Sequence, residues 1–436
     1  MEALFKFKSL VKKILPIFLI DWYHFLLAFL AALIYRFPSY QRRLKIIGVT
    51  GTNGKSTVVK MVSSILEEAG FSTAYSSSIK FKIGDKERKN VMRITMPGRF
   101  AMQKFLRETL NNNCQYVVLE VTSEGIKQHR HRFVNFDVAL ITNLAPEHIE
   151  AHGSFEKYRE AKGKLFKVTK GIHILNLDDE NIDYFLKFPA QKKYFYGLET
   201  EEEQTGEEGE NTKYKILATK YKADSNGITF EINSILFKLN LLGAFNISNA
   251  LAAISVALSQ DIDLETCKRA LEKIKGIPGR METVISEPFK VLVDYAFTPN
   301  ALKKVYQTLR EIKNERQETK MICVLGAAGG GRDKWKRPVL GKIAAKYCDT
   351  IFITNEDPYD EDPMEIINQV AEGTGLKAEK ILDRREAIKQ SLKQAKQGDI
   401  VIITGKGSEP CICIAEGRKI PWDDREVARE EFKKLM

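Results

Sequence analysis

The sequence predicts an α/β protein. It has a central domain with a mainly parallel sheet and a glycine-rich loop, a second α/β domain after it, and a short hydrophobic helical segment before it. Short apolar runs alternate with helical stretches from residue 44 onward, as a sheet covered by helices requires. A Gly/Thr/Asn cluster directly follows the first apolar run. A second series of apolar runs begins near residue 291, after the Gly-Ile-Pro-Gly sequence at 276–279.

The composition is that of a globular chain. Its 436 residues correspond to roughly three domains at the usual domain size. A hydrophobic share of 44% and only 13 Pro exclude a disordered or collagen-like protein. The six cysteines form no CxxC pair and no metal-ligand spacing. We therefore expect neither a zinc ribbon nor a disulfide framework, but small core side chains in a reducing cytosol.

The net charge of +11 is unevenly distributed. Residues 1–43 carry seven Lys or Arg against Glu2 and Asp21, a net charge of +5. No basic and aromatic stripe accompanies this charge, so a nucleic-acid partner is not expected. The basic N-terminus instead favours contact with a membrane surface.

The N-terminal segment 14–35 is long enough to cross a bilayer, but Asp21 and His24 interrupt it. Basic residues flank both ends, so the positive-inside rule gives no orientation. No signal-peptide cleavage site follows. Three alternatives stay open: a peripheral membrane anchor or interfacial helix, a helix packed on the soluble body, and a single span.

The elements follow in order along the chain. The run 44–49 predicts a strand, and the periodic stretch 56–70, which ends at Gly70, predicts a helix. The acidic stretch 199–210 predicts a solvated loop. Further strands are expected at 116–121, 138–142, 173–177, 321–325, 350–354 and 400–404, and further helices at 154–168 and 249–258. We therefore divide the chain into an N-terminal segment 1–43, a central domain 44–278, and a Rossmann-like C-terminal domain 279–436.

The glycine-rich cluster between the first strand and the first helix is a phosphate-binding loop. Its glycines allow backbone N–H groups to surround an anion at a helix N-terminus, while Lys55 adds positive charge and the Ser56 hydroxyl can reach Mg²⁺. A generic Walker A motif would need glycine where Val49 stands, so a more particular variant is present. The loop reads Thr50-Gly51-Thr52-Asn53-Gly54-Lys55-Ser56-Thr57.

This variant, G-T-N-G-K-[ST], resembles the Mur ligase family, and the resemblance continues through almost the whole chain from residue 46. Within the family the later blocks are closest to MurE, which uses ATP to add a third, usually diamino, residue to the D-glutamate of UDP-MurNAc-L-Ala-D-Glu. The matching blocks are Glu120-Val121-Thr122-Ser123, Gln128 with Arg130, Thr142-Asn143-Leu144, Glu147-His148, His152-Gly153, Tyr158 to Phe166 with Lys162, Asn176 to Asp179, Gly243 to Asn249 with Asn246, Pro278-Gly279-Arg280-Met281-Glu282, Asp294 to Pro299, Gly329 to Pro338 with Arg332, and Gly405-Lys406-Gly407-Ser408-Glu409.

The resemblance implies an ATP and Mg²⁺ site and an acyl-phosphate intermediate. It gives the loop Gly51, Thr52, Asn53, Gly54, Lys55, Ser56 and Thr57 to the phosphates, Asn246 and Asn249 to the adenine, Arg280 to the γ-phosphate and Asp294 to the ribose. Ser56, Glu120, His148 and Lys162 are the implied metal ligands, with Lys162 carbamylated by CO₂. Lys55, His148, Lys162 and Arg280 are the implied catalytic residues. Phe297 stands where the family usually has histidine, and we expect ATP use to survive that change.

The remaining blocks imply two substrate sites. A muramyl-peptide acceptor is assigned to Thr95, Thr122, Ser123, Gln128 and Arg130, and a free diamino acid to Arg332, Glu356, Asp357, Tyr359, Gly405 and Glu409. MurE members that select meso-diaminopimelate carry D-N-P-R, whose arginine binds the distal carboxylate. This chain has Glu356-Asp357-Pro358-Tyr359 instead. The missing arginine and the added carboxylates favour lysine, ornithine or a similar diamine.

About 45 residues precede the loop, fewer than the UDP-binding domain of MurE needs, so we expect uridine recognition to be reduced. We hypothesise that the hydrophobic N-terminus brings the enzyme to the inner face of the membrane, where its acceptor is lipid-linked. Two alternatives remain. One is a ligase resembling folylpolyglutamate synthase or cyanophycin synthetase. The other is a membrane-attached nucleotide-binding module without catalysis.

Overall fold

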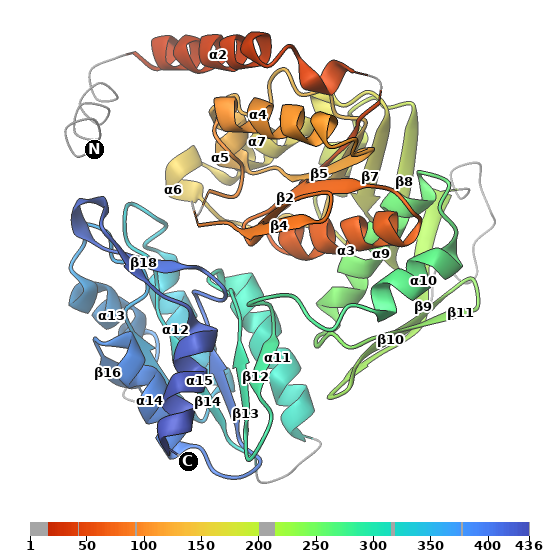
Figure 1. Ribbon diagram of the computed structural model, residues 1–436. Coiled ribbons are helices and arrows are strands. Elements are labelled where there is room, and N and C mark those ends of the chain that lie inside the picture. The colour runs from red at the N-terminus through yellow and green to blue at the C-terminus, as the bar shows by residue number, and fades with distance from the viewer. Residues whose placement is uncertain are drawn as a thin grey trace.

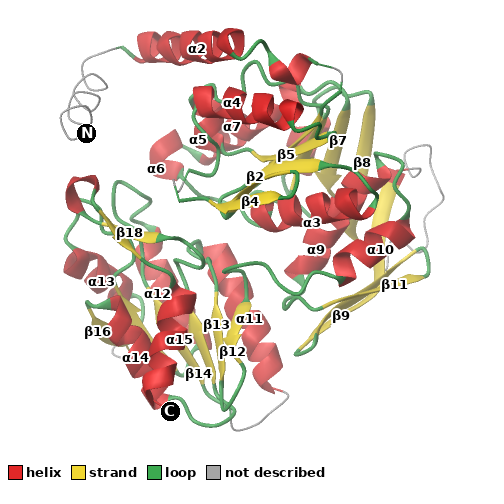
Figure 2. Cartoon of the chain, in the orientation of Figure 1, coloured by secondary structure: helices red, strands yellow, loops and turns green. Residues whose placement is uncertain are grey.

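The computed structural model describes residues 16–41, 43–91, 94–199, 214–314, 319–375 and 378–435. Over these residues the chain forms two helix-covered sheets, seen as two groups of strands in Figures 1 and 2. The α/β prediction is confirmed. Residues 1–15, Arg42 and the acidic stretch 200–210, for which predictions were made, lie outside the described residues.

The first sheet has 11 strands in the described chain and is parallel through its middle. β1 lies between β5 and β6, with Ile47 opposite both Val118 and Val138. Antiparallel hairpins close both ends of the sheet. Its strands are β1 (Lys45–Thr50), β2 (Thr73–Ser76), β3 (Lys80–Ile83), β4 (Lys86–Lys89), β5 (Tyr116–Glu120), β6 (Val138–Ile141), β7 (Ile172–Asn176), β8 (Lys192–Leu198), β9 (Lys215–Asp224), β10 (Gly227–Ile232) and β11 (Ile235–Leu239), in the spatial order β11-β10-β9-β8-β7-β6-β1-β5-β2-β3-β4.

Helices bury both faces of this sheet, because its central strands are apolar on both sides. One core joins the sheet to α3, α9 and α10, and a second core joins it to the helices of the other face. The helices of the first core are α3 (Lys55–Glu68), α9 (Phe245–Leu258) and α10 (Leu264–Glu272); the others are α4 (Arg99–Asn111), α5 (Ser123–Lys127), α6 (Ile149–His152), α7 (Phe155–Val168) and α8 (Ile182–Leu186).

The second sheet has six strands within the described residues, parallel except for its edge strand β12. Apolar cores lie on both of its faces. The six cysteines are free and buried, as expected. The elements are β12 (Glu282–Ile285), β13 (Lys290–Val293), α11 (Pro299–Asn314), β14 (Met321–Leu325), α12 (Lys336–Tyr347), β15 (Thr350–Thr354), α13 (Pro363–Glu372), β16 (Ala378–Ile381), α14 (Arg384–Gln394), β17 (Ile400–Ile403), the hairpin β18 (Cys411–Cys413) and β19 (Lys419–Pro421), and α15 (Asp424–Leu435), with sheet order β12-β13-β17-β14-β15-β16.

We call each sheet with its covering helices a unit. The hydrophobic N-terminal segment contains the helix α2 (Ile17–Ile34), which lies on the outer side of α4 at the surface of the first unit (Figure 1). Ala28, Ala31 and Ala32 are buried on its inner side. The Arg107 guanidinium of α4 donates to the carbonyl oxygen of Tyr35 at 3.0 and 2.6 Å, and so holds the C-terminal end of α2. Among the described helices, none has both the length and the apolar character that crossing a bilayer demands.

Candidate active site

A cavity of about 1350 Å³ opens between the two sheets. It is lined by the loops that follow the carboxyl ends of β1, β5, β6 and β13, where ligands bind in doubly wound sheets. The predicted site residues that line it are Gly51, Thr52, Asn53, Gly54, Lys55, Ser56, Thr57, Thr95, Glu120, Thr122, Ser123, Arg130, His148, Lys162, Asn246, Asn249, Arg280, Asp294, Arg332, Tyr359 and Glu409. Gln128, Glu356, Asp357 and Gly405 are not among the lining residues.

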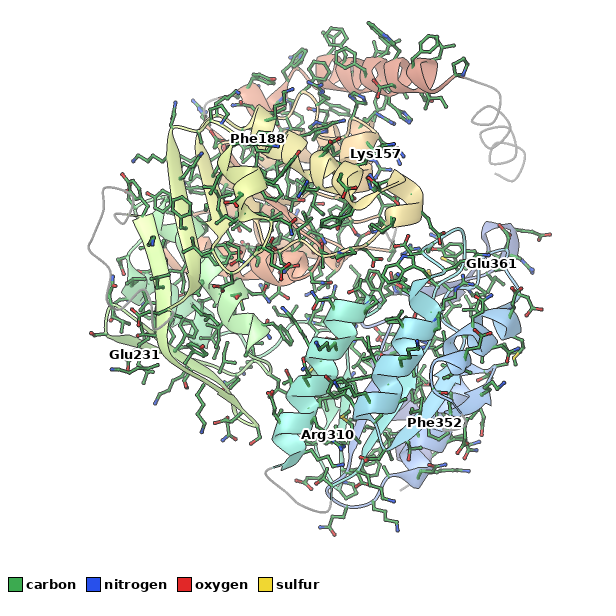
Figure 3. All side chains as sticks on the ribbon, turned by 180° about the vertical axis from the view of Figure 1, so that it is seen from behind. Lys157, Phe188, Glu231, Arg310, Phe352 and Glu361 are labelled. Atoms are coloured by element: carbon green, nitrogen blue, oxygen red, sulfur yellow. The ribbon has the colours of Figure 1, made fainter. Side chains whose placement is uncertain are left out.

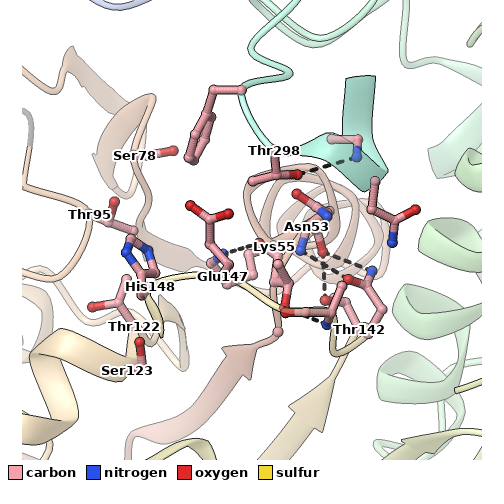
Figure 4. A pocket seen from close by; sticks show the side chains of 18 of the residues that line it. Asn53, Lys55, Ser78, Thr95, Thr122, Ser123, Thr142, Glu147, His148 and Thr298 are labelled. Atoms are coloured by element: carbon pink, nitrogen blue, oxygen red, sulfur yellow. Dashed lines mark hydrogen bonds between the residues drawn. The ribbon is translucent and has the colours of Figure 1, made fainter. Parts of the chain in front are cut away.

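The phosphate-binding loop is held by the chain that follows β6. The Thr52 N–H donates to the Asn143 carbonyl oxygen at 2.8 Å, and the Asn53 N–H donates to Asn143 Oδ1 at 3.0 Å. Thr142 Oγ1 donates to the Asn53 carbonyl oxygen at 2.7 Å, one of the contacts drawn in Figure 4. A Cβ atom on Gly51 would lie 1.9 Å from Thr142 Oγ1, so only glycine fits there. The loop is therefore rigid before any ligand binds.

Gly54 begins α3 with φ at +83°, in the left-handed region that glycine favours. A Cβ atom there would lie 2.3 Å from Asn249 Oδ1 of α9. We expect Gly54→Ala to weaken ATP binding at least about tenfold, because the clash displaces amides that hold an anion. Gly70 is the matched control: its φ is +87° and nothing lies within 4 Å of an added Cβ. Equal ATP affinities of Gly54→Ala and Gly70→Ala, measured by titration calorimetry, would contradict this prediction.

A buried carboxylate lies beside the loop. Glu120, at the end of β5, is 3% exposed. Its Oε2 accepts hydrogen bonds from Ser56 Oγ at 2.8 Å and from the Ser78 N–H at 2.9 Å, while Oε1 lies 4.0 Å from Lys55 Nζ. Burial lowers the pKa of Lys55. Hydroxyl and carboxylate oxygens are the donors that Mg²⁺ prefers, so Ser56 and Glu120 fit a magnesium site.

Lys162 of α7 is buried in the cavity wall. Its Nζ donates to the Gly51 carbonyl oxygen at 2.7 Å and lies 4.6 Å from the centre of the Tyr158 ring. No described carboxylate lies within salt-bridge distance of this amine. Burial, followed by the positive charge of Lys55, lowers the pKa of Lys162 well below its ordinary value. The structure therefore holds a buried amine that is easily neutral, next to the phosphate-binding loop.

Glu147 and His148 follow β6 and face the cavity near Lys55 (Figure 4). Glu147 Oε1 accepts a hydrogen bond from Lys336 Nζ of the second unit at 2.9 Å, and both side chains are buried. Glu147 Oε2 has no partner among the described residues. Burial, and then the charge of Arg332, lowers the pKa of His148 to about 3, so its imidazole is neutral. A neutral imidazole can ligate a metal ion.

The two units meet again where Asp333 caps the short helix α6. Its carboxylate accepts from the Ile149 N–H at 3.3 Å and from the Glu150 N–H at 3.0 Å. Together with the Glu147–Lys336 pair, this contact joins the loop after β6 to the start of α12. Residues from both units therefore enclose one cavity.

The side chains assigned to the nucleotide come from α9 and the second unit. The Arg280 guanidinium stacks over the Tyr295 ring at 4.4 Å, and Lys336 Nζ lies 5.0 Å from the centre of the Phe297 ring. Asn249 Nδ2 donates to Asn246 Oδ1 at 2.9 Å. The Asp294 carboxylate accepts from the Met281 N–H at 2.7 Å and the Ala296 N–H at 2.6 Å. Asp294 thus shapes the chain around Arg280, although it was predicted for a ribose.

The acceptor residues occupy the end of the cavity nearest α5. The Thr122 hydroxyl accepts from the Gly125 N–H at 3.0 Å and caps α5. The Arg130 guanidinium donates to the Met96 carbonyl oxygen and, at 2.8 Å, to Gln128 Oε1. Gln128 therefore orients Arg130 and does not itself line the cavity. Ser123 and Thr95 lie with Thr122 on one side of the site in Figure 4.

The residues assigned to the amino acid divide into two groups. Arg332, Tyr359 and Glu409 line the cavity, and Tyr295 OH donates to Glu409 Oε1 at 3.1 Å. Asp357 and Glu356, in contrast, are not among its lining residues.

The Asp357 carboxylate is taken up inside the second unit. Both of its oxygens lie 2.9 Å from the buried Lys406 Nζ, and Oδ1 also accepts from the Cys413 N–H. Burial, and then the charge of Asp357, raises the pKa of Glu356. A Cβ atom at position 405 would lie 2.4 Å from Glu356 Oε2. Glycine at this position therefore leaves room for the Glu356 side chain. The assignment of these two acids to a substrate ammonium therefore stays a prediction, and neither of them lines the cavity.

Several lining residues received no role from the sequence. Ser78, Lys304 and Lys419 line the cavity, and Lys336 stacks on Phe297 in its wall. Lys336 lies in the block Gly329 to Pro338, which resembles the family, but its partner Glu147 is far away in the chain. Lys419 on β19 comes close only because β19 pairs with β18, which no local pattern indicates.

Comparison with known proteins agrees with this geometry. Residues 49–257 match the model of the Mur ligase middle domain, and residues 279–407 match that of the Mur ligase, glutamate ligase domain. A UDP-N-acetylmuramoyl-L-alanyl-D-glutamate–2,6-diaminopimelate ligase of Syntrophomonas wolfei is 37% identical over 93% of this chain and 81% of the relative. A UDP-N-acetylmuramyl-tripeptide synthetase of Roseiflexus sp. is 34% identical over 94% of this chain and 82% of the relative.

Solved structures agree as well. One of a UDP-N-acetylmuramoyl-L-alanyl-D-glutamate–2,6-diaminopimelate ligase superposes with a TM-score of 0.60 at 29% identity, covering 92% of this chain and 82% of that one. The Mycobacterium tuberculosis folylpolyglutamate synthase has a TM-score of 0.68, covering 87% of this chain and 92% of that one, but only 16% identity, so it shows the shared fold alone. The chain belongs to the Mur ligase family, the ATP-dependent ligases of peptidoglycan synthesis.

Proposed function

We propose that this chain adds a diamino acid to the D-glutamate carboxylate of a muramyl dipeptide, consuming ATP and releasing ADP and phosphate. One observation carries the proposal. A single cavity brings the phosphate-binding loop with Lys55 and the buried Lys162 together with Arg130 of the first unit and Arg332 of the second. A ligase of this kind must hold a nucleotide, a carboxylate acceptor and an amino acid at once, and each has a cationic partner here.

The reaction has two steps. The γ-phosphoryl group of ATP passes to the acceptor carboxylate, which gives an acyl phosphate and ADP; the amine of the incoming residue then attacks the acyl carbon, expels phosphate and loses a proton. Lys55 and the loop amides hold the phosphates, and Arg280 supports the charge that develops on the transferring group. When bound by Ser56, Glu120 and His148, Mg²⁺ would offset the negative charge of the phosphates and the carboxylate.

We propose that Lys162 is carbamylated. A protonated lysine would repel the metal ion and add to the repulsion from Lys55, whereas a carbamate is an anionic oxygen ligand. Carbamates form on neutral amines. The burial of Lys162 and the absence of a carboxylate partner among the described residues both support a neutral amine at this position.

We assign Arg130, with Thr95, Thr122 and Ser123, to the acceptor, and Arg332 to the α-carboxylate of the incoming residue. Glu409, whose Oε2 also pairs with Lys406 Nζ at 2.7 Å, adds negative charge beside its side-chain amine. In this scheme residues 44–278 hold the acceptor and most of the nucleotide, and residues 279–436 bring the amino acid and Arg280. The chain boundaries at 43 and 278 stay predictions.

The identity of the amino acid that is added as the third residue of the peptide is still open. Two of the three carboxylates that favoured lysine or ornithine do not line the cavity, and Lys419, which does, offers a cation for a distal carboxylate. The two curated relatives described above are a diaminopimelate ligase and a tripeptide synthetase. We therefore propose meso-diaminopimelate as the first candidate, with lysine and ornithine as the alternatives.

The test is phosphate release from ATP and Mg²⁺ with UDP-MurNAc-L-Ala-D-Glu, comparing meso-diaminopimelate, lysine and ornithine, with product masses measured in parallel. Release that requires both the acceptor and one amino acid, with the matching mass gain, would support the function and name the third residue. Lys419→Met should then weaken use of meso-diaminopimelate more than use of lysine, since only the former has a second carboxylate.

Two results would count against the proposal. ATP binding without acceptor-dependent release would favour a nucleotide-binding module without catalysis. Release with glutamate and a folate acceptor in place of the muramyl peptide would favour a ligase resembling folylpolyglutamate synthase, whose fold is shared.

A further inference from the structure

The outer face of α2 is the largest group of exposed apolar side chains that we find in the described chain. Six of its apolar or aromatic side chains are more than half exposed: Phe18, Trp22, Tyr23, Leu26, Leu33 and Ile34. Phe18, Trp22, Leu26 and Leu33 recur at intervals of four and seven residues, so they share one side of the helix, and Tyr23 and Ile34 flank that side. Figure 3 shows side chains projecting from α2 away from the body. A soluble monomer rarely exposes so continuous an apolar surface without a binding function.

The inner face of α2 is fixed to the protein. Besides the buried alanines, the Phe25 ring packs 5.4 Å from the Phe133 ring, and Asp21 Oδ1 lies 2.7 Å from His129 Nε2. Arg99 of α4 contacts His24 and also donates from Nε to the Gln128 carbonyl oxygen at 2.9 Å. Asp21 and His24, which interrupt the hydrophobic segment, thus contact the protein body, although the Asp21 side chain stays 61% exposed. The helix lies along the surface of the body with its other side uncovered.

Positive charge accompanies this apolar face. Arg36 and Arg43 are exposed just after α2, and Lys164 is an electrostatic neighbour of Asp21. Lys12 and Lys13 precede the helix in the sequence. Basic residues beside exposed aromatic and aliphatic side chains are typical of helices that lie in the interface of an anionic bilayer.

A second copy of the chain fits this face less well. A two-fold symmetric contact would place the same surface against itself. The basic surface that carries Arg36, Arg43 and Lys164 would then lie against an equally basic surface, and like charge would oppose the contact. An anionic lipid surface instead complements both the charge and the apolar side chains.

We propose that α2 is an interfacial helix that docks the protein on anionic phospholipid bilayers through Phe18, Trp22, Leu26 and Leu33, supported by Arg36 and Arg43. This inference goes beyond the proposed function and does not depend on it. One consequence does depend on the proposed function. His129 pairs with Asp21 of α2 and lies between Gln128 and Arg130 in the sequence. Docking places the Arg130 end of the cavity beside the lipid surface, where a lipid-linked acceptor would be presented.

The test is co-sedimentation of the full-length protein with phosphatidylcholine vesicles that do or do not contain phosphatidylglycerol. We expect binding to the anionic vesicles that weakens with salt. Phe18→Ser/Trp22→Ser should reduce the partition coefficient at least about tenfold, because two large apolar side chains no longer enter the interface. Arg36→Gln/Arg43→Gln should reduce it about tenfold on anionic vesicles alone. The control is Val91→Ser/Tyr221→Ser, which removes exposed apolar side chains elsewhere and should bind as the wild type does.

A second measurement protects against misfolding of a variant. Trp22 in the wild-type protein should shift its emission to shorter wavelength when anionic vesicles are added, and Trp22→Phe should lose that shift. Three outcomes would overturn the proposal: no binding to anionic vesicles, equal binding of the wild type and Phe18→Ser/Trp22→Ser, or a concentration-dependent dimer that this double variant abolishes while vesicles bind neither protein. Ligase activity on a soluble acceptor is measured separately, so its failure would leave the membrane result intact.

Discussion

Replacing Lys162 with alanine is expected to lower the rate of phosphate release by about 10²–10³-fold, the usual cost of losing one preorganised electrostatic group. ATP binding should change little, because Lys55 and the loop amides remain. The reason is the position of Lys162: its buried Nζ contacts the Gly51 carbonyl oxygen next to the phosphate-binding loop. Steady-state release and titration calorimetry with ATP would measure the two effects.

Two variants can distinguish a role of Lys162 as a metal ligand from a role in packing. Lys162→Met fills the same space without an amine, and Lys162→Ala leaves a void that a small carboxylate such as formate can enter. Rescue of Lys162→Ala by formate, without rescue of Lys162→Met, would support a carbamate. Lys164→Ala is the matched control, since Lys164 is exposed on the same helix. Full activity of Lys162→Ala would contradict the assignment.

Breaking the pair between Glu147 and Lys336 should have the largest effect on stability. Lys336→Met leaves the Glu147 carboxylate buried without its partner at 2.9 Å. Removal of one member of a buried ion pair costs about 3–5 kcal/mol in the free energy of unfolding. The loss should appear in urea unfolding followed by circular dichroism, and in activity, because the pair joins the two units across the cavity.

Removing both charges should be less harmful than removing one. Glu147→Gln/Lys336→Met leaves no unpaired buried charge, so part of the stability should return. Lys334→Met is the control: Lys334 is half-exposed and pairs with Glu361 at 3.3 Å, a contact worth about 0–1 kcal/mol. A midpoint for Lys336→Met that equals that of Lys334→Met would contradict the prediction.

The phosphate-binding loop and its sheet could be predicted because their signals are local. The expected strand 44–49 is β1 (Lys45–Thr50), and the expected helix 56–70 is α3 (Lys55–Glu68). The strands expected at 321–325 and 350–354 coincide with β14 and β15. Apolar runs and glycine-rich loops lie next to each other in the chain, so a single sequence reveals them.

The orientation of side chains between distant segments could not be predicted. Asp357 binds Lys406, which is 49 residues away, and Asp357 does not line the cavity. The sequence shows two acids after a strand but not that Lys406 pairs with Asp357. For the same reason, the sequence does not show that Lys419 lines the cavity or that Lys336 pairs with Glu147. Family blocks indicated which segments meet, whereas the direction of each side chain depends on packing in the second unit.

Each sheet is built from one continuous stretch of chain, residues 45–239 for the first and 282–403 for the second. Among the described residues, the polypeptide therefore passes from one sheet to the other only once, by way of α9 and α10. A gene divided near codon 278 would still encode every strand of each sheet intact. The two encoded domains could then be duplicated or recombined separately. The condition is that the surfaces carrying Glu147 and Lys336 stay complementary.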